Sequence, residues 1–328
     1  MKTRQLALCV LIVAWFAAPV AGQELKKVRV GIPTLSLIVA SSLIPGERGY
    51  FKQEGLDVDL IVIRSAPSVL ALAAREIDFL TIGGGGLSGI LRGLPLRVAF
   101  APFNRPLYAL YANPEIRSLP ELDGKKVGVS SFGSAPDLLL RDLLKKRIPD
   151  GGKKVTILAV GGGVERFIAL KTGVVDAAVL ATPFTVNAKQ DGYRELFSFI
   201  NERDYADIPV ATFTREDLLQ SNSALVERFV RAQAKGLLYM RGSRDRSVSS
   251  LARALKVKED AVGGGFDELR PALTEDGTIT QNDQRKALEY LVNLATLKEA
   301  PRLDKIYDFT IAKKVFQELQ ARGWKPTD

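Results

Sequence analysis

Past residue 25, short apolar runs rich in Val and Ile alternate with longer stretches in which apolar residues recur every three or four positions. The short runs predict buried strands, and the three-to-four spacing predicts amphipathic helices. The expected strands cover 27–32, 57–63, 78–82, 96–101, 126–130, 154–160, 175–180 and 209–214. The expected helices cover 36–53, 67–75, 135–147, 164–172, 183–191, 215–241, 247–256, 282–298 and 311–321. This alternation predicts the α/β class, with open and mostly parallel sheets flanked by helices.

The pattern occurs twice along the chain. Lys26-Lys27-Val28-Arg29-Val30 is followed 99 residues later by Lys125-Lys126-Val127-Gly128-Val129, and Val62–Asp78 lines up with Val160–Asp176 at an offset of 98. Any two strand–helix units share some features, so a chance likeness is the alternative. The constant register favours two lobes of the same build.

Turn-forming residues mark two crossovers between these lobes. The first consists of Tyr111-Ala-Asn-Pro114 followed by Leu119-Pro-Glu-Leu-Asp-Gly124, and the second lies near Asp207-Ile208-Pro209. Pro and Gly in such clusters are typical of connections rather than of helices or strands. The prediction is therefore a discontinuous lobe one, at 23–111 and 209–328 with a helical C-terminal region, and an inserted lobe two at 112–208.

Residues 1–22 have the pattern of a signal peptide. Lys2 and Arg4 form a positive end, and the apolar run from Leu6 to Ala18 is short for a membrane span. Small residues then precede Gln23, which we expect to be the mature N-terminus. The alternative is an uncleaved anchor. Either form predicts a periplasmic or other extracytoplasmic protein.

The composition removes several kinds of chemistry. The 328 residues include no histidine, and the single cysteine, Cys9, lies in the leader. Triads built on histidine, thiol nucleophiles, disulfides and zinc sites are thereby excluded from the mature chain. The net charge of +9 is scattered, and its densest cluster, Lys145-Lys146-Arg147, ends a predicted helix. Cations are favourable at the end of a helix, so this cluster does not indicate a nucleic-acid partner, and we expect none. We also expect no metal and no cofactor.

Four stretches carry a resemblance to a known family. They are Arg48-Gly-Tyr-Phe-Lys-Gln-Glu-Gly-Leu-Asp-Val58, Ser118-Leu-Pro-Glu-Leu-Asp-Gly-Lys-Lys-Val-Gly-Val129, Ala169-Leu-Lys-Thr-Gly-Val-Val-Asp-Ala177 and Asn222-Ser-Ala-Leu-Val-Glu-Arg-Phe-Val-Arg-Ala232. In this order they resemble motifs of the type II periplasmic solute-binding proteins of ABC importers, of the aliphatic-sulfonate, taurine, nitrate and thiamine-pyrimidine-precursor kind. The resemblance implies a two-lobed Venus-flytrap fold and a small-molecule ligand between the lobes. It also implies delivery of this ligand to a membrane permease and its ATPase. We expect the protein to be a monomer.

Two other functions stay open. One is an enzyme on the same fold that uses carboxylate or lysine chemistry on a small metabolite, although no paired-carboxylate spacing stands out. The other is a sensor module that docks to a membrane receptor. The leader and the missing histidine favour a non-enzymatic binding protein.

Ligands of open α/β sheets bind beyond the carboxyl ends of the strands, and here those loops are rich in Gly and Ser. Glycine lets the backbone approach a ligand and point N–H groups at it. For any single glycine run, tight packing of a helix against a strand explains the glycines as well as ligand binding does. The candidate ligand-binding residues are Leu35, Ser36, Gly84, Gly85, Gly86, Arg105, Ser131, Phe132, Gly133, Ser134, Gly162, Gly163, Val164, Pro183 and Phe184.

Helix starts are expected at Leu87, Ala135 and Val164, where unpaired N–H groups and the helix dipole favour an anionic ligand group such as a sulfonate or carboxylate. Ser hydroxyls are expected to donate to the same group. Arg105 has two readings, as a partner of an anion or as a brace of the hinge. Phe132 and Phe184 either stack on the ligand or belong to the core.

Overall fold

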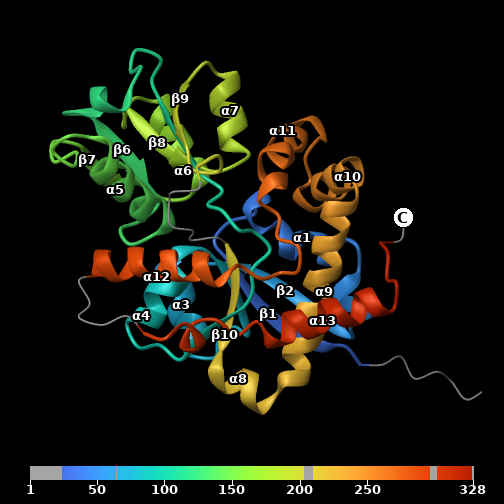
Figure 1. The fold of residues 1–328 in the computed structure, drawn as a ribbon. Helices are drawn as coiled ribbons and strands as arrows, with labels where there is room; N and C mark the ends of the chain where they lie inside the picture. The colour runs from blue at the N-terminus through green and yellow to red at the C-terminus, as the bar shows by residue number, and fades with distance from the viewer. Residues whose placement is uncertain (1–23, 64, 203–209, 296–300, 327–328) are drawn as a thin grey trace, which may run out of the picture.

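The computed structural model describes residues 24–63, 65–202, 210–295 and 301–326, and within them the chain forms two five-stranded sheets, one in each of two lobes (Figure 1). The expected leader at 1–22, the mature start at Gln23 and the second crossover at 207–209 lie outside the described residues. No described helix is both long enough and apolar enough to cross a membrane.

The first sheet belongs to the first lobe. Its strands, in spatial order, are β2 (Leu56–Val62), β1 (Lys26–Ile32), β3 (Phe79–Ile82), β10 (Ala211–Arg215) and β4 (Leu96–Phe100). β10 is antiparallel to both of its neighbours, and β1 is parallel to β2 and to β3. β10 is the strand expected near 209–214, and it returns the chain from the second lobe to the first sheet, between β3 and β4.

The second sheet repeats this order in the second lobe. Its strands are β7 (Thr156–Ala159), β6 (Lys126–Val129), β8 (Ala177–Leu180), β5 (Ala109–Ala112) and β9 (Arg194–Ser198). β5 pairs antiparallel with β8 and β9, as β10 pairs with β3 and β4. The prediction of two lobes with similar, mostly parallel sheets is confirmed.

Helices cover both faces of the sheets (Figure 1). Those of the first lobe are α1 (Ala40–Glu47), α2 (Tyr50–Gln53), α3 (Ser65–Ala73), α4 (Gly84–Leu91), α8 (Glu216–Ser221), α9 (Ser223–Gly242), α10 (Arg244–Leu255), α11 (Asp260–Leu269), α12 (Gln281–Ala295) and α13 (Thr310–Ala321). Those of the second lobe are α5 (Ala135–Arg147), α6 (Gly163–Lys171) and α7 (Phe184–Gln190). On β3, Phe79 packs toward α1 and α9 whereas Leu80 packs toward α3 and α4, because successive strand residues face opposite sides.

Helix α5 shows how the local sequence sets an element. Pro136 lies in its first turn, where a missing N–H costs no hydrogen bond, and Asp137 accepts the N–H of Gly133 at 2.8 Å. Lys145, Lys146 and Arg147 fill the last turn and complement the helix dipole. The expected helix at 135–147 is confirmed.

Several elements differ from the expectation. The expected helix at 36–53 is divided into α1 and α2, and the one at 215–241 into α8 and α9. β5 and β9 were not predicted, and the expected lobe boundary at residue 111 falls inside β5. The first crossing therefore lies upstream, at 101–108, between β4 and β5. α11 was also missed, and α4 begins at Gly84 rather than at Leu87. A strand of four residues carries too little periodicity to be recognised, and glycine is a poor helix former that only tertiary packing overrides.

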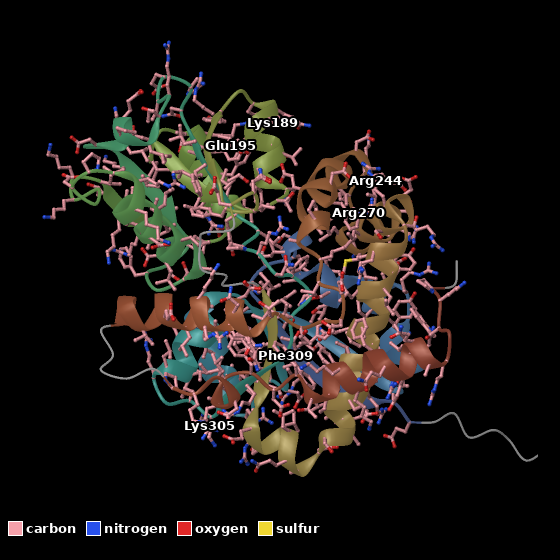
Figure 2. The ribbon with its side chains drawn as sticks, in the orientation of Figure 1. Lys189, Glu195, Arg244, Arg270, Lys305 and Phe309 are labelled. Atoms are coloured by element: carbon pink, nitrogen blue, oxygen red, sulfur yellow. The ribbon has the colours of Figure 1, made fainter. Side chains whose placement is uncertain are left out.

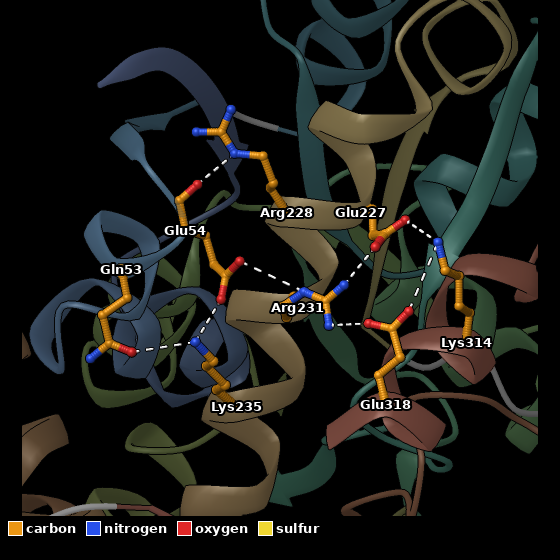
Figure 3. Close-up of polar contacts among 8 residues, drawn as sticks. All are labelled: Gln53, Glu54, Glu227, Arg228, Arg231, Lys235, Lys314 and Glu318. Atoms are coloured by element: carbon orange, nitrogen blue, oxygen red, sulfur yellow. Dashed lines mark hydrogen bonds and ion pairs between the residues drawn. The ribbon is translucent and has the colours of Figure 1, made fainter. Parts of the chain in front are cut away.

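Charged side chains hold the C-terminal helices on the first lobe (Figure 3). Arg231 of α9 forms ion pairs with Glu227 at 2.5 Å and with Glu318 of α13 at 2.6 Å. Lys235 of α9 reaches Glu54, directly after α2, at 2.5 Å. Because these side chains are only partly exposed, water screens their pairing less than it would on an open surface. The network connects α2, α9 and α13.

Candidate functional site

A cleft of about 330 Å³ lies between the two lobes. Its lining residues are Pro33, Thr34, Ile38, Pro67, Ile82, Gly83, Gly84, Gly85, Tyr108, Ser130, Ser131, Ser134, Ala135, Pro136, Gly161, Gly162, Gly163, Arg166 and Val210. Most of them follow the carboxyl ends of β1, β3, β6 and β7, where open α/β sheets bind ligands. The volume is at the lower end of the range for small-molecule sites.

Six of the residues singled out from the sequence line this cleft. They are Gly84, Gly85, Ser131, Ser134, Gly162 and Gly163. The first two come from the start of α4 in the first lobe, and the other four come from the second lobe. The loops predicted to converge therefore do so, although they lie up to 79 residues apart in sequence.

A shallower depression of about 220 Å³ adjoins the cleft and shares Gly85, Ser131 and Ser134 with it. Gly133 and Phe132 line this side depression, and Phe132 is 65% exposed. The guanidinium carbon of Arg141 lies 6.0 Å from the centre of the Phe132 ring. Phe132 is therefore neither part of the core nor part of the cleft in this conformation.

The other candidates lie outside the lining of the cleft. Leu35 is 57% exposed, Val164 is also exposed, and Ser36 is buried. The structure packs Gly86 and Phe184 inside the lobes, because a Cβ on Gly86 would lie 2.6 Å from the Phe213 ring and the Phe184 ring covers Gly163.

Arg105 and Pro183 complete the set. Nη1 of Arg105 donates to the carbonyl of Ile200, at 3.4 Å, so this side chain bridges the two segments that connect the lobes. This contact favours the hinge reading of Arg105. Pro183 follows a cis peptide bond with Thr182 and precedes α7.

The Ser hydroxyls are used within their own loop. Ser130 Oγ donates to Ser134 Oγ at 2.7 Å, and Ser134 Oγ donates to the carbonyl of Ser131 at 2.6 Å. The hydroxyl protons of Ser130 and Ser134 are thus used within the loop, and these two residues present acceptor lone pairs to the cleft. The expectation that a Ser hydroxyl donates to a ligand stays a prediction for Ser131. Donors come instead from the starts of α4 and α6, which no side chain caps.

Arg166 was missed by sequence reasoning, and it is the only described lining residue with a charged side chain. It is 5% exposed, Nη1 donates to the carbonyl of Gly161 at 3.0 Å, and Nε has no hydrogen-bond partner. Burial lowers the pKa of Arg166 from its ordinary value, but a guanidinium stays charged in proteins. The signal available was an arginine in the first turn after a glycine run, which is also common on solvated helix faces.

Tyr108 was missed as well, and it directly precedes β5, a strand that the sequence did not predict. It is buried in the lining of the cleft. Burial raises the pKa of the Tyr108 phenol above 10.0, and the charge of Arg166 acts in the opposite direction. The phenol therefore stays protonated at neutral pH and can donate a hydrogen bond.

The described residues contain no group of three or more potential metal ligands. They also place no Asp, Glu or Lys in the lining of the cleft. The site thus offers backbone N–H groups, one guanidinium, one phenol and an apolar wall. This arrangement can bind a molecule, but it holds no side chain with the pKa of a general base at neutral pH.

Comparisons with known proteins give both a family and a fold. A family model described as NMT1/THI5-like matches residues 39–246. No curated protein sequence matches the chain. The alkanesulfonate-binding protein SsuA of Xanthomonas axonopodis pv. citri, solved with MOPS bound, is 16% identical, with a TM-score of 0.71 over 87% of this chain and 99% of that one.

Two further solved structures are similar. The periplasmic nitrate-binding protein NrtA of Synechocystis PCC 6803 is 12% identical, with a TM-score of 0.71 over 91% of this chain and 90% of that one. The desulfurization enzyme DSZB is 16% identical, with a TM-score of 0.64 over 89% of this chain and 99% of that one. These likenesses confirm the predicted two-lobed periplasmic-binding fold, which hosts both binding proteins and an enzyme.

Proposed function

Because this chain belongs to the NMT1/THI5-like family, we propose that it is the extracytoplasmic solute-binding component of an ABC-type importer. In this role it captures a small organic molecule between its lobes and delivers it to a membrane permease with an ATPase. We propose further that it acts as a monomer and without a cofactor. SsuA and NrtA, which share its fold, are described as an alkanesulfonate-binding and a nitrate-binding protein.

The single observation that carries this proposal is the composition of the cleft. Gly84 and Gly85 of the first lobe face Ser131, Gly162 and Gly163 of the second across a space of about 330 Å³. A ligand there contacts both lobes only when they are close together, so it favours the closed form by its differential affinity. The two segments between the sheets are the places where the lobes can hinge.

The enzyme alternative is supported by the fold of DSZB alone. Catalysis would need a general base or nucleophile in the cleft, and the described lining residues include no carboxylate, lysine, histidine or cysteine. The hydroxyls of Ser130 and Ser134 are hydrogen-bonded within their loop, with no base beside them. Binding without turnover is therefore the function that this chemistry fits best.

The test uses the exported mature chain. Calorimetry with alkanesulfonates, carboxylates, nitrate and pyrimidines should identify a ligand that binds one to one, and mass spectrometry should recover it unchanged. X-ray scattering should show a smaller radius of gyration in the saturated protein. A chemically altered ligand would support the enzyme instead, and unchanged scattering at saturation would contradict closure.

Variants locate the binding site. A valine at position 85 adds an isopropyl group to the cleft wall, and the nearest neighbour of a Cβ there is Ile82 Cδ1 at 3.4 Å. Gly85→Val should therefore weaken binding while leaving the Tm of the empty protein nearly unchanged. Gly46→Val is the matched control, since Gly46 is an exposed helical glycine with no neighbour within 4 Å. Equal loss of affinity in both variants would place the ligand elsewhere.

A further inference from the structure

Four cationic side chains are buried among the described residues, and three of them have acidic partners. Arg97 pairs with Glu216 at 2.7 Å, Arg215 with Asp217 at 3.0 Å, and Lys235 with Glu54 at 2.5 Å. Arg166 is the fourth, and no described acid forms an ion pair with it. A buried charge without a partner is strongly unfavourable, so this position calls for a counter-ion.

The one carboxylate whose charge acts on Arg166 is that of its neighbour Glu165, which opposes the lowering of the Arg166 pKa by burial. The Glu165 side chain is exposed, lies against Gly161 and Gly162 outside the lining of the cleft, and forms no described ion pair with Arg166. One guanidinium N–H is occupied by the carbonyl of Gly161, and Nε has no partner. The guanidinium borders the cleft, where a bound molecule can reach its remaining donors.

From this contrast we infer that Arg166 binds the anionic group of the ligand, and that the ligand carries one negative charge and no positive charge. The inference rests on the proposed function and specifies its ligand class. Tyr108 lines the same cleft and adds a hydroxyl donor. A carboxylate or sulfonate fits this pair of donors, because a guanidinium hydrogen-bonds planar or tetrahedral oxyanions through two N–H groups.

The rest of the cleft specifies the remainder of the molecule. Ile38, Pro67, Ile82, Pro136 and Val210 form an apolar wall. Since no Asp or Glu is among the described lining residues, an ammonium group in the cleft would be desolvated without a counter-charge. The ligand class is therefore a carboxylate or sulfonate with an uncharged, largely apolar body, and amino acids and aminosulfonates are selected against.

The experiment compares matched probes by calorimetry. Each set contains an aliphatic or aromatic carboxylate or sulfonate, its neutral amide, and the same acid with an added amino group. We expect the plain acids to bind at least about 10-fold more tightly than both relatives, which is about 1.4 kcal/mol. Equal affinity for an acid and its amide, or tighter binding of the amino acid, would overturn the inference.

Arg166→Gln separates a ligand-binding role from a structural one. Removing an unpaired buried charge should leave the Tm of the empty protein equal or higher, while affinity for the acid falls about 100-fold and approaches that of the amide. The matched control is Arg97→Gln, which breaks the ion pair of the buried Arg97 with Glu216, and neither residue lines the cleft. It should lower the Tm and leave the preference for the acid intact.

The outcomes also separate the inference from the proposed function. If neutral or zwitterionic probes bind and contract the protein while the acids do not, the binding function stands and the charge inference fails. If Arg166→Gln lowers the Tm but keeps the preference for acids, Arg166 is a structural residue and the inference fails. If no probe of any charge binds, both fail.

Discussion

Asp78 in the first lobe and Asp176 in the second lie at equivalent positions, directly before β3 and β8. Each carboxylate accepts a backbone N–H of the neighbouring strand at 2.8 Å, from Arg29 and from Lys126 respectively. Each backbone N–H donates back to the carbonyl of that same residue, also at 2.8 Å. The two lobes are thus built alike down to single hydrogen bonds, with an offset of 98 residues between the aspartates.

The same offset shows where the lobes diverge. Arg166 in α6 corresponds to Ser68 in α3, which is fully buried. Gly84-Gly85-Gly86 corresponds to Thr182-Pro183-Phe184. The shared frame brings helix starts to the cleft from both sides, and the divergent positions decide the chemistry. The second lobe contributes the positive charge of Arg166 to the cleft. The first lobe contributes glycine residues whose backbone N–H groups can approach a ligand closely.

The largest change in unfolding free energy should come from substitutions in the glycine run of the first lobe, which stands where the second lobe has Thr182-Pro183-Phe184. A Cβ on Gly86 would lie 2.6 Å from the Phe213 ring, whereas one on Gly85 would lie 3.4 Å from a flexible end of Ile82. We expect Gly86→Ala to lose about 3 kcal/mol of unfolding free energy by overpacking. Gly85→Ala should be neutral or gain up to about 1 kcal/mol from helix propensity. Urea unfolding measures both, and equal stability of the two variants would contradict the packing account.

The next largest loss of unfolding free energy is expected at the two equivalent aspartates, Asp78 and Asp176. Asp78→Ala and Asp176→Ala each leave a strand N–H without its charged acceptor, and each should lower the unfolding free energy by about 2 kcal/mol. Asp57→Ala is the control, since Asp57 is exposed on β2. If one of the two variants loses far more unfolding free energy than the other in the same denaturant titration, the two aspartates are not equivalent.

A smaller difference concerns the turns after α3 and α6. Gly173 and Arg75 are equivalent and both have positive φ, +72° and +66°. Gly173→Ala should lose about 1 kcal/mol, because only glycine adopts this conformation without strain. Arg75→Gly should be close to neutral, since the exposed ion pair of Arg75 with Asp217 contributes little. Thermal unfolding tests this, and a neutral Gly173→Ala would refute it.

The smallest effect is expected where the lobes touch outside the cleft, near Glu195 and Lys189 (Figure 2). Thr185 of α7 donates to Glu268 of α11 at 2.7 Å. Burial, with the charge of Glu195 as a further contribution, raises the pKa of Glu268 above 4.5, while the Thr185 hydrogen bond and Lys189 act in the opposite direction.

A carboxyl group with a raised pKa in the folded state destabilises that state as the pH rises through the raised value. Glu268→Gln should therefore raise the Tm slightly at about pH 8 and have no effect at about pH 4. Asp260→Asn, at an exposed position of the same helix, controls for the loss of one negative charge. A Tm gain for Glu268→Gln that is independent of pH would show that ionisation is not its cause.

Elements with strong local patterns were predicted well from the sequence. The helix at 135–147 has apolar periodicity, a proline in its first turn and basic residues in its last, and its bounds are confirmed. The strands rich in Val and Ile, the duplication and the returning strand near 209–214 are confirmed for the same reason. Periodicity over several residues reports which face is buried, and burial dominates the choice of element.

Elements that depend on contacts with distant parts of the chain were not predicted from the sequence. β5 is a four-residue strand recognisable only by its pairing with β8 and β9. α11 contains Gly263-Gly264-Gly265, and a Cβ on Gly265 would collide with Thr182 and Leu37 from other parts of the chain. Glycine in these helices reflects a close approach that no local pattern encodes.

The sequence by itself determined the two-lobed α/β frame and brought the glycine-rich loops to one cleft, because strand direction and hydrophobic period are local properties. Only the tertiary structure decided which side chains face that cleft. Arg166 became a candidate ligand-binding residue because it is buried in the lining of a cleft formed by loops of both lobes, and no Asp or Glu is among the described lining residues. Whether a buried charge has a partner depends on segments far apart in the chain, and spacing along the sequence does not record it.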